Sequence, residues 1–454
     1  MSGVARAPAF DFFLAALRTG GGDAQITGAG ALPSVYPVTD FAAASIAAAC
    51  LAAADLIEAR GHARPAVAVD RRLASLWFKG TVRPQGWELP PAWDAVAGDY
   101  QTADGWIRLH TNAAHHRRAV LRVLGVPAER AEVARAAARW QAGALESAVV
   151  DAGGCAAEMR GCAAWAAHNQ GSAVAREPVL HNLATPAAPK PVWPDNPARP
   201  LAGIRVLDLT RVLAGPAATR FLAGLGADVL RIDPPDWEEA SLLAEMTLGK
   251  RCARLDLRTR QGRGIFERLL VSSDVLVHGY RSDALELIGL GMERRRMLNP
   301  GLVDVALDAY GWNGPWRTRR GFDSLVQMSS GIAHAGMVRY GKDRPTPLPV
   351  QALDYGAGYL LAAAALSGLT RRVTGGEGSQ MRTSLARMAA LLVSGAGEAG
   401  EAPEAREKPG DFDEKTEMTA WGPALRLKPP VAIAGAPLRW DVPAGKLGMA
   451  KAEW

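Results

Sequence analysis

The segment from Pro200 to Asp233 most narrows the folds that this chain can adopt. Residues 200–209 end in an apolar run, which leads into the turn sequence Thr-Arg-Val-Leu-Ala-Gly-Pro at 210–216. A largely apolar stretch of helical length, residues 217–225, then leads to a second apolar run that closes at Asp233. This order of strand, glycine turn, helix and strand is typical of a parallel α/β sheet. It predicts the opening unit of a domain that handles a nucleotide-containing ligand.

The same alternation of strands and helices continues as far as residue 306. Right-handed crossovers between successive strands would give a mostly parallel, doubly wound sheet. Strands are expected at Val206–Leu209, Val229–Ile232, Ala253–Leu257, Val275–Val277 and Val303–Ala306. Helical connections are expected at Phe221–Leu225, Gly262–Leu270 and Ala284–Ile288. The predicted fold class is therefore α/β, with this sheet beside a smaller α/β module.

Composition divides the chain into units. Pro, Ala and Lys crowd residues 184–200, which predicts a linker with its boundary near residue 195. Residues 395–415 are rich in Gly, Glu, Pro and Lys, and a flexible linker is expected there. The expected units are residues 1–195, which include the small α/β module, residues 196–394, which hold the sheet, and a C-terminal return segment at 416–454.

One pattern occurs in both units. Leu32–Asp40, followed by an alanine-rich helix, is similar to Leu348–Asp354 and the apolar helix after it. At a similar interval further on come Val67–Phe78 in the first unit and Gln380–Leu392 in the second. This self-similarity suggests an internal duplication. Alanine contributes little transfer free energy and charged residues follow at once, so Phe41–Ala53 is expected to be a buried helix rather than a membrane span.

Charge and cysteine content restrict the partners and the compartment. A net charge of +6 suits an anionic ligand, but the basic residues are dispersed, which disfavours nucleic acid as a partner. The four cysteines lack the paired spacing of a zinc site and the density of a secreted scaffold, so no metal is expected. Residues 1–22 do not have the layout of a signal peptide. A cytoplasmic location without membrane attachment is predicted.

The turn at residues 210–216 lacks the G-x-G-x-x-G spacing with which a backbone approaches a dinucleotide. A nicotinamide-dependent dehydrogenase is thus disfavoured. Free backbone N–H groups where the turn opens a helix can still bind a phosphate. In the alternative interpretation, Gly215 and Pro216 only shape the turn, and the residues alone leave both interpretations open.

Asp354 is the acid best placed for chemistry. It lies just before an apolar helix that opens with Tyr355-Gly-Ala-Gly358. Orphan N–H groups and the helix dipole stabilise a carboxylate at such a position, so Asp354 would stay ionised and could attack a thioester. A helix-capping aspartate, worth about 1 kcal/mol, accounts for the same residue, and the local sequence favours that role.

A series of short stretches with a specific order and spacing favours the catalytic role of Asp354 over the helix cap. They are Leu207–Pro216, Leu225–Asp233, Gly249–Arg251, Leu255–Asp256, Arg320–Asp323 and Gln351–Asp354. In these stretches the chain resembles the class III CoA-transferase (CaiB/BaiF) family, which includes formyl-CoA transferase, carnitine CoA-transferase and α-methylacyl-CoA racemases. The resemblance implies an interlocked α/β fold, a homodimer, and an enzyme that moves CoA from an acyl-CoA to a small carboxylic acid. CoA is then a substrate, and no permanently bound cofactor is implied.

The resemblance gives Asp354 the role of nucleophile. It implies an aspartyl-acyl anhydride and an aspartyl-CoA thioester as intermediates, and a carboxylate suits this because its acyl adduct stays reactive toward another carboxylate. Backbone N–H groups near Gly356 would help to stabilise the oxyanion. The first unit resembles the later part of the family, with Asp40 at the nucleophile position. No CoA-binding sheet precedes Asp40, so a vestigial helix cap is expected.

The resemblance also implies a CoA-binding set along the sheet. Arginines in this set can donate charge-assisted hydrogen bonds to phosphates. The implied residues are Leu213, Ala214, Leu255, Asp256, Leu257, Arg258, Gly279, Tyr280, Arg281, Arg320, Gly321, Phe322 and Asp323. Lys250 and Arg251 are further candidates, with a structural role as the alternative. Trp77, Trp87 and Trp106 are candidates for packing an acyl chain or for filling core.

Departures from the family pattern leave other functions open. Pro234 and Gly279 replace an arginine and an asparagine that are frequent in the family, and its glycine-rich loop is not recognisable, although Arg83–Trp87 could occupy its place. The racemases carry Gly-His-Asp where this chain has Gly321-Phe-Asp323, and phenylalanine cannot shuttle a proton. A racemase or isomerase, with His334 as a substitute acid, is the alternative. A non-catalytic acyl-CoA-binding protein is another.

Overall fold

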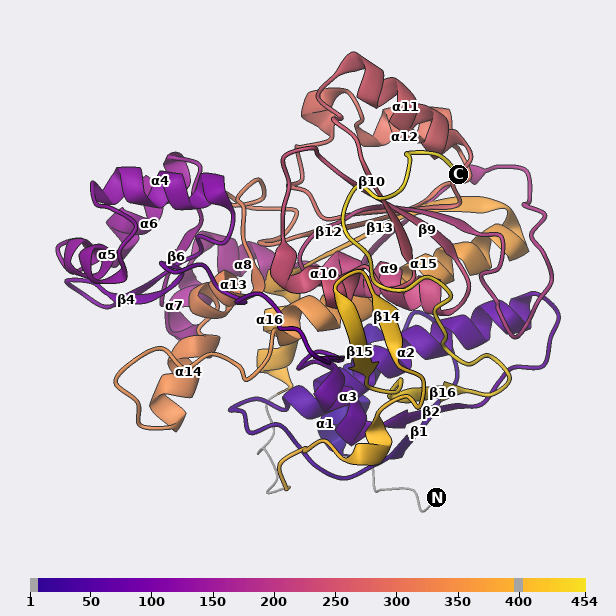
Figure 1. The fold of residues 1–454 in the computed structure, drawn as a ribbon, viewed down its shortest axis with the longest axis horizontal. Coiled ribbons are helices and arrows are strands. Elements are labelled where there is room, and N and C mark those ends of the chain that lie inside the picture. Colours follow the sequence, from indigo (N-terminus) through magenta and orange to yellow (C-terminus); the bar gives the residue numbers. More distant parts are fainter. Residues whose placement is uncertain (1–6, 396–402) are drawn as a thin grey trace.

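The computed structural model describes residues 7–395 and 403–454 and is centred on a seven-stranded sheet (Figure 1). Its strand order is β10-β9-β8-β11-β12-β13-β7, and neighbours pair in parallel except for β13 with β7 at one edge. The strands are β7 His181–Ala187, β8 Arg205–Leu209, β9 Asp228–Asp233, β10 Lys250–Arg254, β11 Val275–His278, β12 Val303–Asp308 and β13 Glu377–Ser384. The predicted α/β class with a mostly parallel sheet is confirmed.

Alternating apolar side chains along the strands build a core on each face of the sheet. Val206 packs on the face that also carries the buried residues of α9 and α15, whereas its neighbour Leu207 packs with Phe266 of α11 on the other face. The helices that accompany the sheet are α9 Ala214–Gly224, α10 Ala240–Met246, α11 Arg260–Val271, the 3-10 helix η1 Glu286–Ile288, α12 Met292–Leu298, α15 Ala352–Gly375 and α16 Leu385–Ser394. The sheet is thus covered on both faces, as the doubly wound prediction requires.

Strand β10 differs from its expected position. It covers Lys250–Arg254, whereas the sequence suggested Ala253–Leu257. After the strand ends, Asp256 caps a turn by accepting the backbone N–H of Arg258, and the side chain of Thr259 caps α11. Leu255 and Leu257 pack against the same core as the strand, which explains why the apolar pattern extends beyond it.

The first unit and the C-terminal segment build two small sheets together. Strand β16 pairs with β2 in a sheet ordered β1-β2-β16, and β15 pairs with β3 in a sheet ordered β14-β15-β3. The elements are α1 Pro8–Leu17, β1 Ala24–Thr27, α2 Val38–Ala59, β2 Val67–Asp70, α3 Arg71–Trp77, β3 Val82–Pro84, β14 Glu417–Thr419, β15 Gly422–Arg426 and β16 Val431–Ile433. The last part of the chain therefore completes the first unit.

A small module extends to the left in Figure 1. It contains a three-stranded sheet ordered β4-β5-β6 with its own apolar core. The elements are β4 Gly98–Gln101, β5 Trp106–Leu109, β6 Ala156–Glu158, α4 Ala114–Leu124, α5 Arg130–Ala137, α6 Ala142–Asp151, α7 Cys162–Ala167 and α8 Asn169–Ala175. Helices α13 Asp323–Ser329 and α14 Ile332–Arg339 lie next to it and lead back to the sheet domain.

Helices α2 and α15 pack on each other at the centre of the molecule. Both have the length and hydropathy of a membrane span, but 94% of the apolar window of each is buried inside the structure. The expected buried helix at Phe41–Ala53 is the central part of α2. These two helices are core helices of the described fold.

Two segments expected to be linkers show defined contacts. Residues 184–187 belong to β7 and pair with β13, so the chain enters the main sheet before residue 195. Of the expected linker at 395–415, residues 396–402 lie outside the described residues. In the described part, Ala405 donates its backbone N–H to the carbonyl of Ala31, and Asp411 binds Arg72. These contacts join the segment to the first unit.

Candidate active site

Asp354 lies in the first turn of α15, two residues after the helix begins at Ala352. Its side chain lines two cavities at once. One, the groove, has a volume of about 330 Å³ and lies along the ends of β8, β11 and β12. The other, the chamber, has a volume of about 850 Å³ and lies between the sheet domain and the first unit. Asp354 is therefore where the two cavities meet.

Asp323 fixes the backbone at this point. Its Oδ2 accepts the backbone N–H of Asp354 at 2.9 Å, and its Oδ1 accepts a hydrogen bond from Nε2 of Gln327 at 2.5 Å. The amide of Gln327 in turn accepts the backbone N–H of Leu348 at 2.8 Å. The first residue of α13 thus holds the start of α15 in place.

The two carboxyl groups have raised pKa values. Burial raises the pKa of Asp323 to about 6, although its hydrogen bonds with Gln327 and with backbone N–H groups oppose this rise. Burial, and then the nearby charge of Asp323, raise the pKa of Asp354 well above its usual range. Desolvation at this buried position therefore opposes the ionised state that the helix start was expected to favour.

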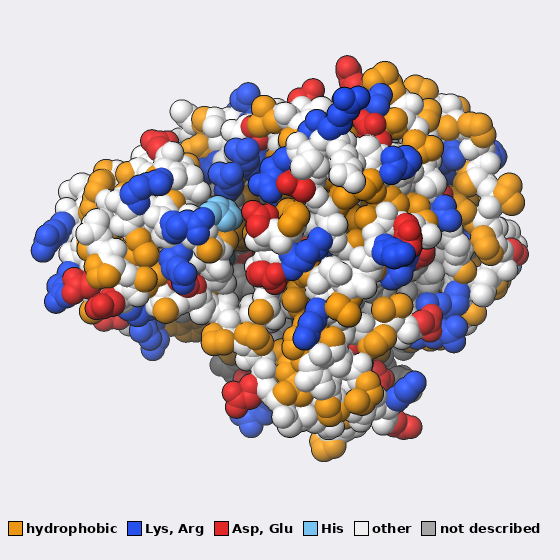
Figure 2. Space-filling view, turned by 45° about the horizontal axis from the view of Figure 1, so that its top comes forward, with side chains coloured by type: hydrophobic (Ala, Val, Ile, Leu, Met, Phe, Trp, Pro, Cys, Tyr) orange, Lys and Arg blue, Asp and Glu red, His pale blue; other side chains and the backbone are white. Residues whose placement is uncertain are grey.

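The groove contains most of the residues that were expected to bind CoA. Figure 2 shows Lys and Arg side chains around a hollow between the small module and the sheet domain. The expected residues that line the groove are Ala214, Gly279, Tyr280, Arg281, Arg320, Gly321 and Phe322. Among the described residues, Arg320 forms no ion pair, so its guanidinium is available to an anion.

The other expected CoA-binding residues lie elsewhere. Leu213 and Asp323 line the chamber. The segment Leu255–Arg258 follows β10 at the same edge of the sheet, but its residues Leu255, Asp256, Leu257 and Arg258 line neither the groove nor the chamber. Arg258 is exposed, and its Nε donates to Oδ1 of Asp256 at 2.8 Å.

The expected Tyr280 and two residues that were not expected from the sequence, Arg211 and Trp237, form one wall of the groove. The guanidinium of Arg211 lies 4.5 Å from the ring centre of Trp237 and 5.2 Å from that of Tyr280. Arg211 also donates to the Tyr280 hydroxyl at 3.2 Å. Arg211 is in the turn after β8, a position that parallel α/β sheets often use for ligands, so sequence position was the available signal.

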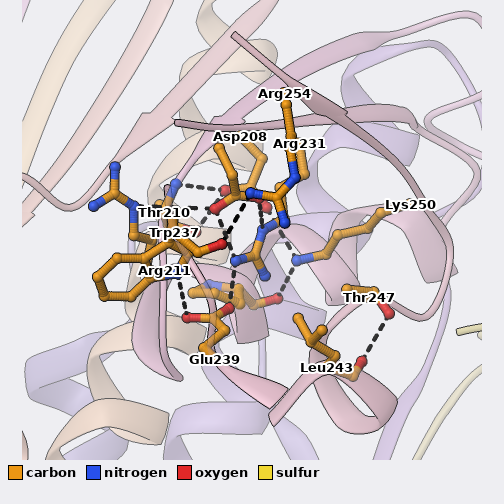
Figure 3. Close-up of polar contacts among 12 residues, drawn as sticks. Asp208, Thr210, Arg211, Arg231, Trp237, Glu239, Leu243, Thr247, Lys250 and Arg254 are labelled. Atoms are coloured by element: carbon orange, nitrogen blue, oxygen red, sulfur yellow. Dashed lines mark hydrogen bonds and ion pairs between the residues drawn. The ribbon is translucent and has the colours of Figure 1, made fainter. Parts of the chain in front are cut away.

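The turn after β8 is strained at Val212 and held by a buried ion-pair network (Figure 3). Val212 has a φ of 66°, which is uncommon for a β-branched residue. Its backbone N–H donates to Oε2 of Glu239 at 2.9 Å, and the other carboxylate oxygen of Glu239 pairs with Arg231. Arg231 is fully buried and also binds Asp233 at 2.8 Å. The network positions the segment that separates the groove from the chamber, because Val212 lines both.

Lys250 also stabilises the turn after β8, through its contact with Asp208 (Figure 3). Its Nζ lies 3.0 Å from Oδ2 of Asp208 and 2.9 Å from the carbonyl oxygen of Pro216, with a side chain that is 0% exposed. Arg251 lies on the outer side of β10 and pairs with Asp228 at 3.0 Å. Both contacts fit the structural alternative for this pair of basic residues.

Two histidines from the small module pack against the ring of Phe322. The ring of His110 stacks on Phe322 with a centroid distance of 3.8 Å and an interplanar angle of 8°. Burial lowers the pKa of His110 and of His116 to about 3, so both imidazoles are neutral at physiological pH. His334, the residue considered as a substitute acid, lies in α14 and lines neither cavity.

The chamber receives one wall from the first unit. Residues 78–83, 89–94 and 110–113 all contribute to its lining. Arg83 is the part of the Arg83–Trp87 loop that faces the chamber. The tryptophans that line it are Trp93 and Trp237, whereas the three expected from the sequence pack elsewhere: Trp77 beside Trp440, Trp87 on Trp421, and Trp106 against the buried side of α13.

Glycines in the first turns of α15 allow close helix packing. A Cβ atom at Gly358 would lie 2.4 Å from the carbonyl oxygen of Ala214, and one at Gly356 would lie 2.3 Å from the ring of Phe41. The open backbone that the sequence suggests is therefore occupied at these two positions by α9 and by α2. A role of the N–H groups near Gly356 in oxyanion binding stays a prediction.

Asp40 has the same helical position in α2 as Asp354 has in α15. Both aspartates lie two residues after the first residue of their helix. Thirty residues after each aspartate, a strand ends at the N-cap residue of another helix, Asp70 or Ser384. The side chain of that N-cap residue accepts the backbone N–H of the residue three positions later. Asp40 differs in its partner, because Arg71 binds it at 2.7 and 3.1 Å. Leu385 has the place of Arg71 beside Asp354 and lines the groove. The internal duplication stays a prediction.

The site is a buried carboxylate between two cavities, at the carboxyl edge of a mostly parallel sheet, which is where α/β proteins commonly bind ligands. Residues 201–420 match CoA-transferase family III.

Relatives match part of the chain. It is 33% identical over 204 residues to the probable fatty acyl-CoA transferase Rv3272 of Mycobacterium tuberculosis, covering 42% of this chain and 51% of that protein. It is 31% identical over 205 residues to succinate–glutarate CoA-transferase of Agrobacterium fabrum, covering 41% and 51%. A crystal structure of Rv3272 matches with a TM-score of 0.41 and 32% identity, covering 44% of this chain and 59% of that one. The chain thus spans about half the length of these curated relatives.

Proposed function

We propose that this protein is a CoA-transferase in which Asp354 is the nucleophile. The observation that carries the proposal is that the Asp354 side chain lines both the groove and the chamber. A thioester has a nucleotide-bearing thiol on one side of its carbonyl carbon and an acyl group on the other. A carboxylate at the junction of the two cavities is therefore placed to reach that carbon. The named activities of the two curated relatives support the same reaction class.

The reaction begins when a carboxylate oxygen of Asp354 attacks the acyl carbonyl carbon. The C–S bond breaks, CoA leaves as its thiolate, and an aspartyl-acyl anhydride remains. The thiolate then attacks the aspartyl carbonyl carbon, which releases the donor acid as a carboxylate and leaves an aspartyl-CoA thioester. The acceptor carboxylate attacks this thioester, and the thiolate returns to the acceptor carbonyl of the new anhydride. The new acyl-CoA leaves, and the Asp354 carboxylate is restored.

The groove would hold the CoA part. Arg281 and Arg320 line it, and their guanidinium groups can form charge-assisted hydrogen bonds with phosphates. Arg211, packed between Trp237 and Tyr280, would line the path of the ligand toward Asp354. Between these walls, the thiol end of CoA would reach the start of α15.

The raised pKa of Asp354 sets a condition for the first step. A protonated carboxyl is a poor nucleophile, so the proton of Asp354 has to leave before attack. Asp323 opposes this loss by its charge, yet it also fixes the backbone of Asp354 by accepting its N–H. Phe322 stands at the position of the racemase histidine and cannot shuttle a proton, which disfavours a racemase. A homodimer and a cytoplasmic location stay predictions.

The test is covalent trapping at Asp354. The purified full chain is incubated with a panel of acyl-CoAs and quenched with hydroxylamine, and its peptides are analysed by mass spectrometry. The proposal expects a hydroxamate at Asp354, its loss in Asp354→Asn, and its retention in the matched control Asp343→Asn, whose side chain lies in an exposed loop. CoA release without any adduct at Asp354 would contradict the nucleophile assignment.

A further inference from the structure

We infer that the chamber selects uncharged, apolar acyl groups of at least medium chain length or an aryl equivalent, and excludes dicarboxylic acids. This inference rests on the proposed function, because it assigns the substrate class of that same site. It is carried by three observations, which are the apolar lining of the chamber, the pairing of its charged side chains, and the origin of its far wall.

The lining is dominated by aromatic and aliphatic side chains. Phe78 and Tyr355 stack at a ring distance of 4.9 Å on one side, and Trp93, Leu242 and Val350 contribute further apolar surface. A volume of about 850 Å³ is within the range of pockets that enclose drug-sized ligands. An acetyl or formyl group would leave most of this apolar surface in contact with water, whereas a longer acyl group would cover it and gain about 25 cal/mol for each Å² removed from water.

Among the described residues, the Lys and Arg side chains that line the chamber are already paired with carboxylates. They are Lys79 and Arg83. Lys79 pairs with Glu404 at 3.9 Å, and Arg83 binds both carboxylate oxygens of Glu407, one of them at 3.2 Å. Both partners come from the segment at 403–411 outside the chamber. A distal carboxylate would have to compete with Glu404 and Glu407 for these two cations, or remain unpaired beside the apolar lining.

The acidic residues of the lining are also neutralised, apart from the reacting pair. Asp94 pairs with Arg117 at 2.9 Å, and Glu245 accepts Thr81 at 2.8 Å and binds Arg220. Glu238 and Glu239 pair with Arg254 and Arg231. A cationic acyl group therefore finds no free carboxylate except Asp323 and Asp354 at the reacting end.

Residues outside the family match form the far wall. Phe78, Leu89, Trp93 and His110 precede residue 201, where the match to the family begins. The acyl specificity of this chain therefore depends on a part of the chain that the family match does not cover. Because donor and acceptor are bonded in turn to the same Asp354, the acceptor acid has to fit the same chamber and belongs to the same apolar class.

Equilibrium binding separates this inference from the proposed function. The full-length Asp354→Asn variant, which lacks the nucleophile, is titrated by calorimetry with CoA, acetyl-CoA, octanoyl-CoA, benzoyl-CoA, glutaryl-CoA and 4-trimethylammoniobutanoyl-CoA. The inference expects octanoyl-CoA or benzoyl-CoA to bind at least tenfold more tightly than CoA, and glutaryl-CoA to bind no more tightly than CoA. Tighter binding of the glutaryl or trimethylammonio compound than of the apolar ones overturns it.

Paired variants locate the selectivity in the chamber. Leu242→Trp should weaken octanoyl-CoA binding at least tenfold, whereas the matched Leu287→Trp, at a position that is 71% exposed, should leave it unchanged. Leu242→Arg should raise the affinity for glutaryl-CoA at least tenfold, and Leu287→Arg should not. Equal effects at the two positions would overturn the inference. Selective binding without covalent trapping in the parent chain would contradict the proposed function and leave the inference standing.

Discussion

The backbone N–H of Asp354 donates to the carboxylate of Asp323 at 2.9 Å, so one acid holds the other in position while raising its pKa. The hydrogen bond links the first residue of α13 to the first turn of α15. The Asp323 side chain thus both positions Asp354 and raises the pKa of its carboxyl. This relationship leads directly to the behaviour expected of two variants.

Replacing Asp354, the proposed nucleophile, should stabilise the fold at high pH. An acid whose pKa is higher in the folded chain than its usual 3.8 binds its proton more tightly when folded, so the free energy of unfolding falls as pH rises from about 4 through the folded pKa. Asp354→Asn removes that loss. We expect its free energy of unfolding at pH 8 to exceed that of the parent, and the difference to shrink at pH 5. Urea unfolding at the two pH values measures this, and a variant that is less stable at pH 8 contradicts it.

Removing the charge of Asp323 should shift the pH profile. Asp323→Asn takes a negative charge away from Asp354 and keeps one oxygen that can accept its N–H, so the pKa of Asp354 should fall. The rise of the acyl-CoA-dependent release of CoA with pH should move to lower pH. Rates at saturating acyl-CoA between pH 5 and 9 check this, with Asp343→Asn as the control. A profile that moves to higher pH would show that Asp323 lowers the pKa of Asp354.

Arg320 and Arg258 should differ in their effect on CoA affinity. Arg320 lines the groove, whereas Arg258 is exposed and already bonded to Asp256. A charge-assisted hydrogen bond to a phosphate contributes about 1.5–3 kcal/mol. Arg320→Ala is therefore expected to weaken CoA binding by roughly 10- to 100-fold, and Arg258→Ala by less than about threefold. Calorimetric titration with CoA alone gives both values, and a larger loss in Arg258→Ala would move the CoA site toward β10.

Loss of the Glu239 carboxylate should disturb the strained turn at Val212. Glu239 accepts the Val212 N–H and pairs with the buried Arg231, so Glu239→Ala leaves both groups without this acceptor. We expect roughly a tenfold weaker affinity for CoA, from a loss of about 1.4 kcal/mol, together with lower stability. Glu238→Ala is the matched control, since Glu238 pairs with Arg254 near the surface. Unchanged CoA affinity in a folded Glu239→Ala protein would show that the turn keeps its shape without this contact.

Local sequence determined the sheet and the helix that carries Asp354. Apolar runs of strand length, the glycine turn after β8 and the run that opens α15 are short-range signals, and β8, β9, β11 and β12 overlap the ranges expected from them. Asp354 was found as a candidate in the same way, because its place at a helix start is encoded by its neighbours in sequence. The boundary of β10 was displaced, since Leu255 and Leu257 extend the apolar pattern while packing as loop residues.

Only the tertiary structure decided what surrounds Asp354. The pKa of its carboxyl depends on burial and on Asp323, which is 31 residues away in sequence, and the chamber depends on Trp93 and His110 from another unit. The structure also decided that Lys250 is buried against Asp208, whereas Arg258 is exposed beside Asp256. Desolvation and long-range contacts arise only when distant segments pack together, so no local pattern of residues could specify them.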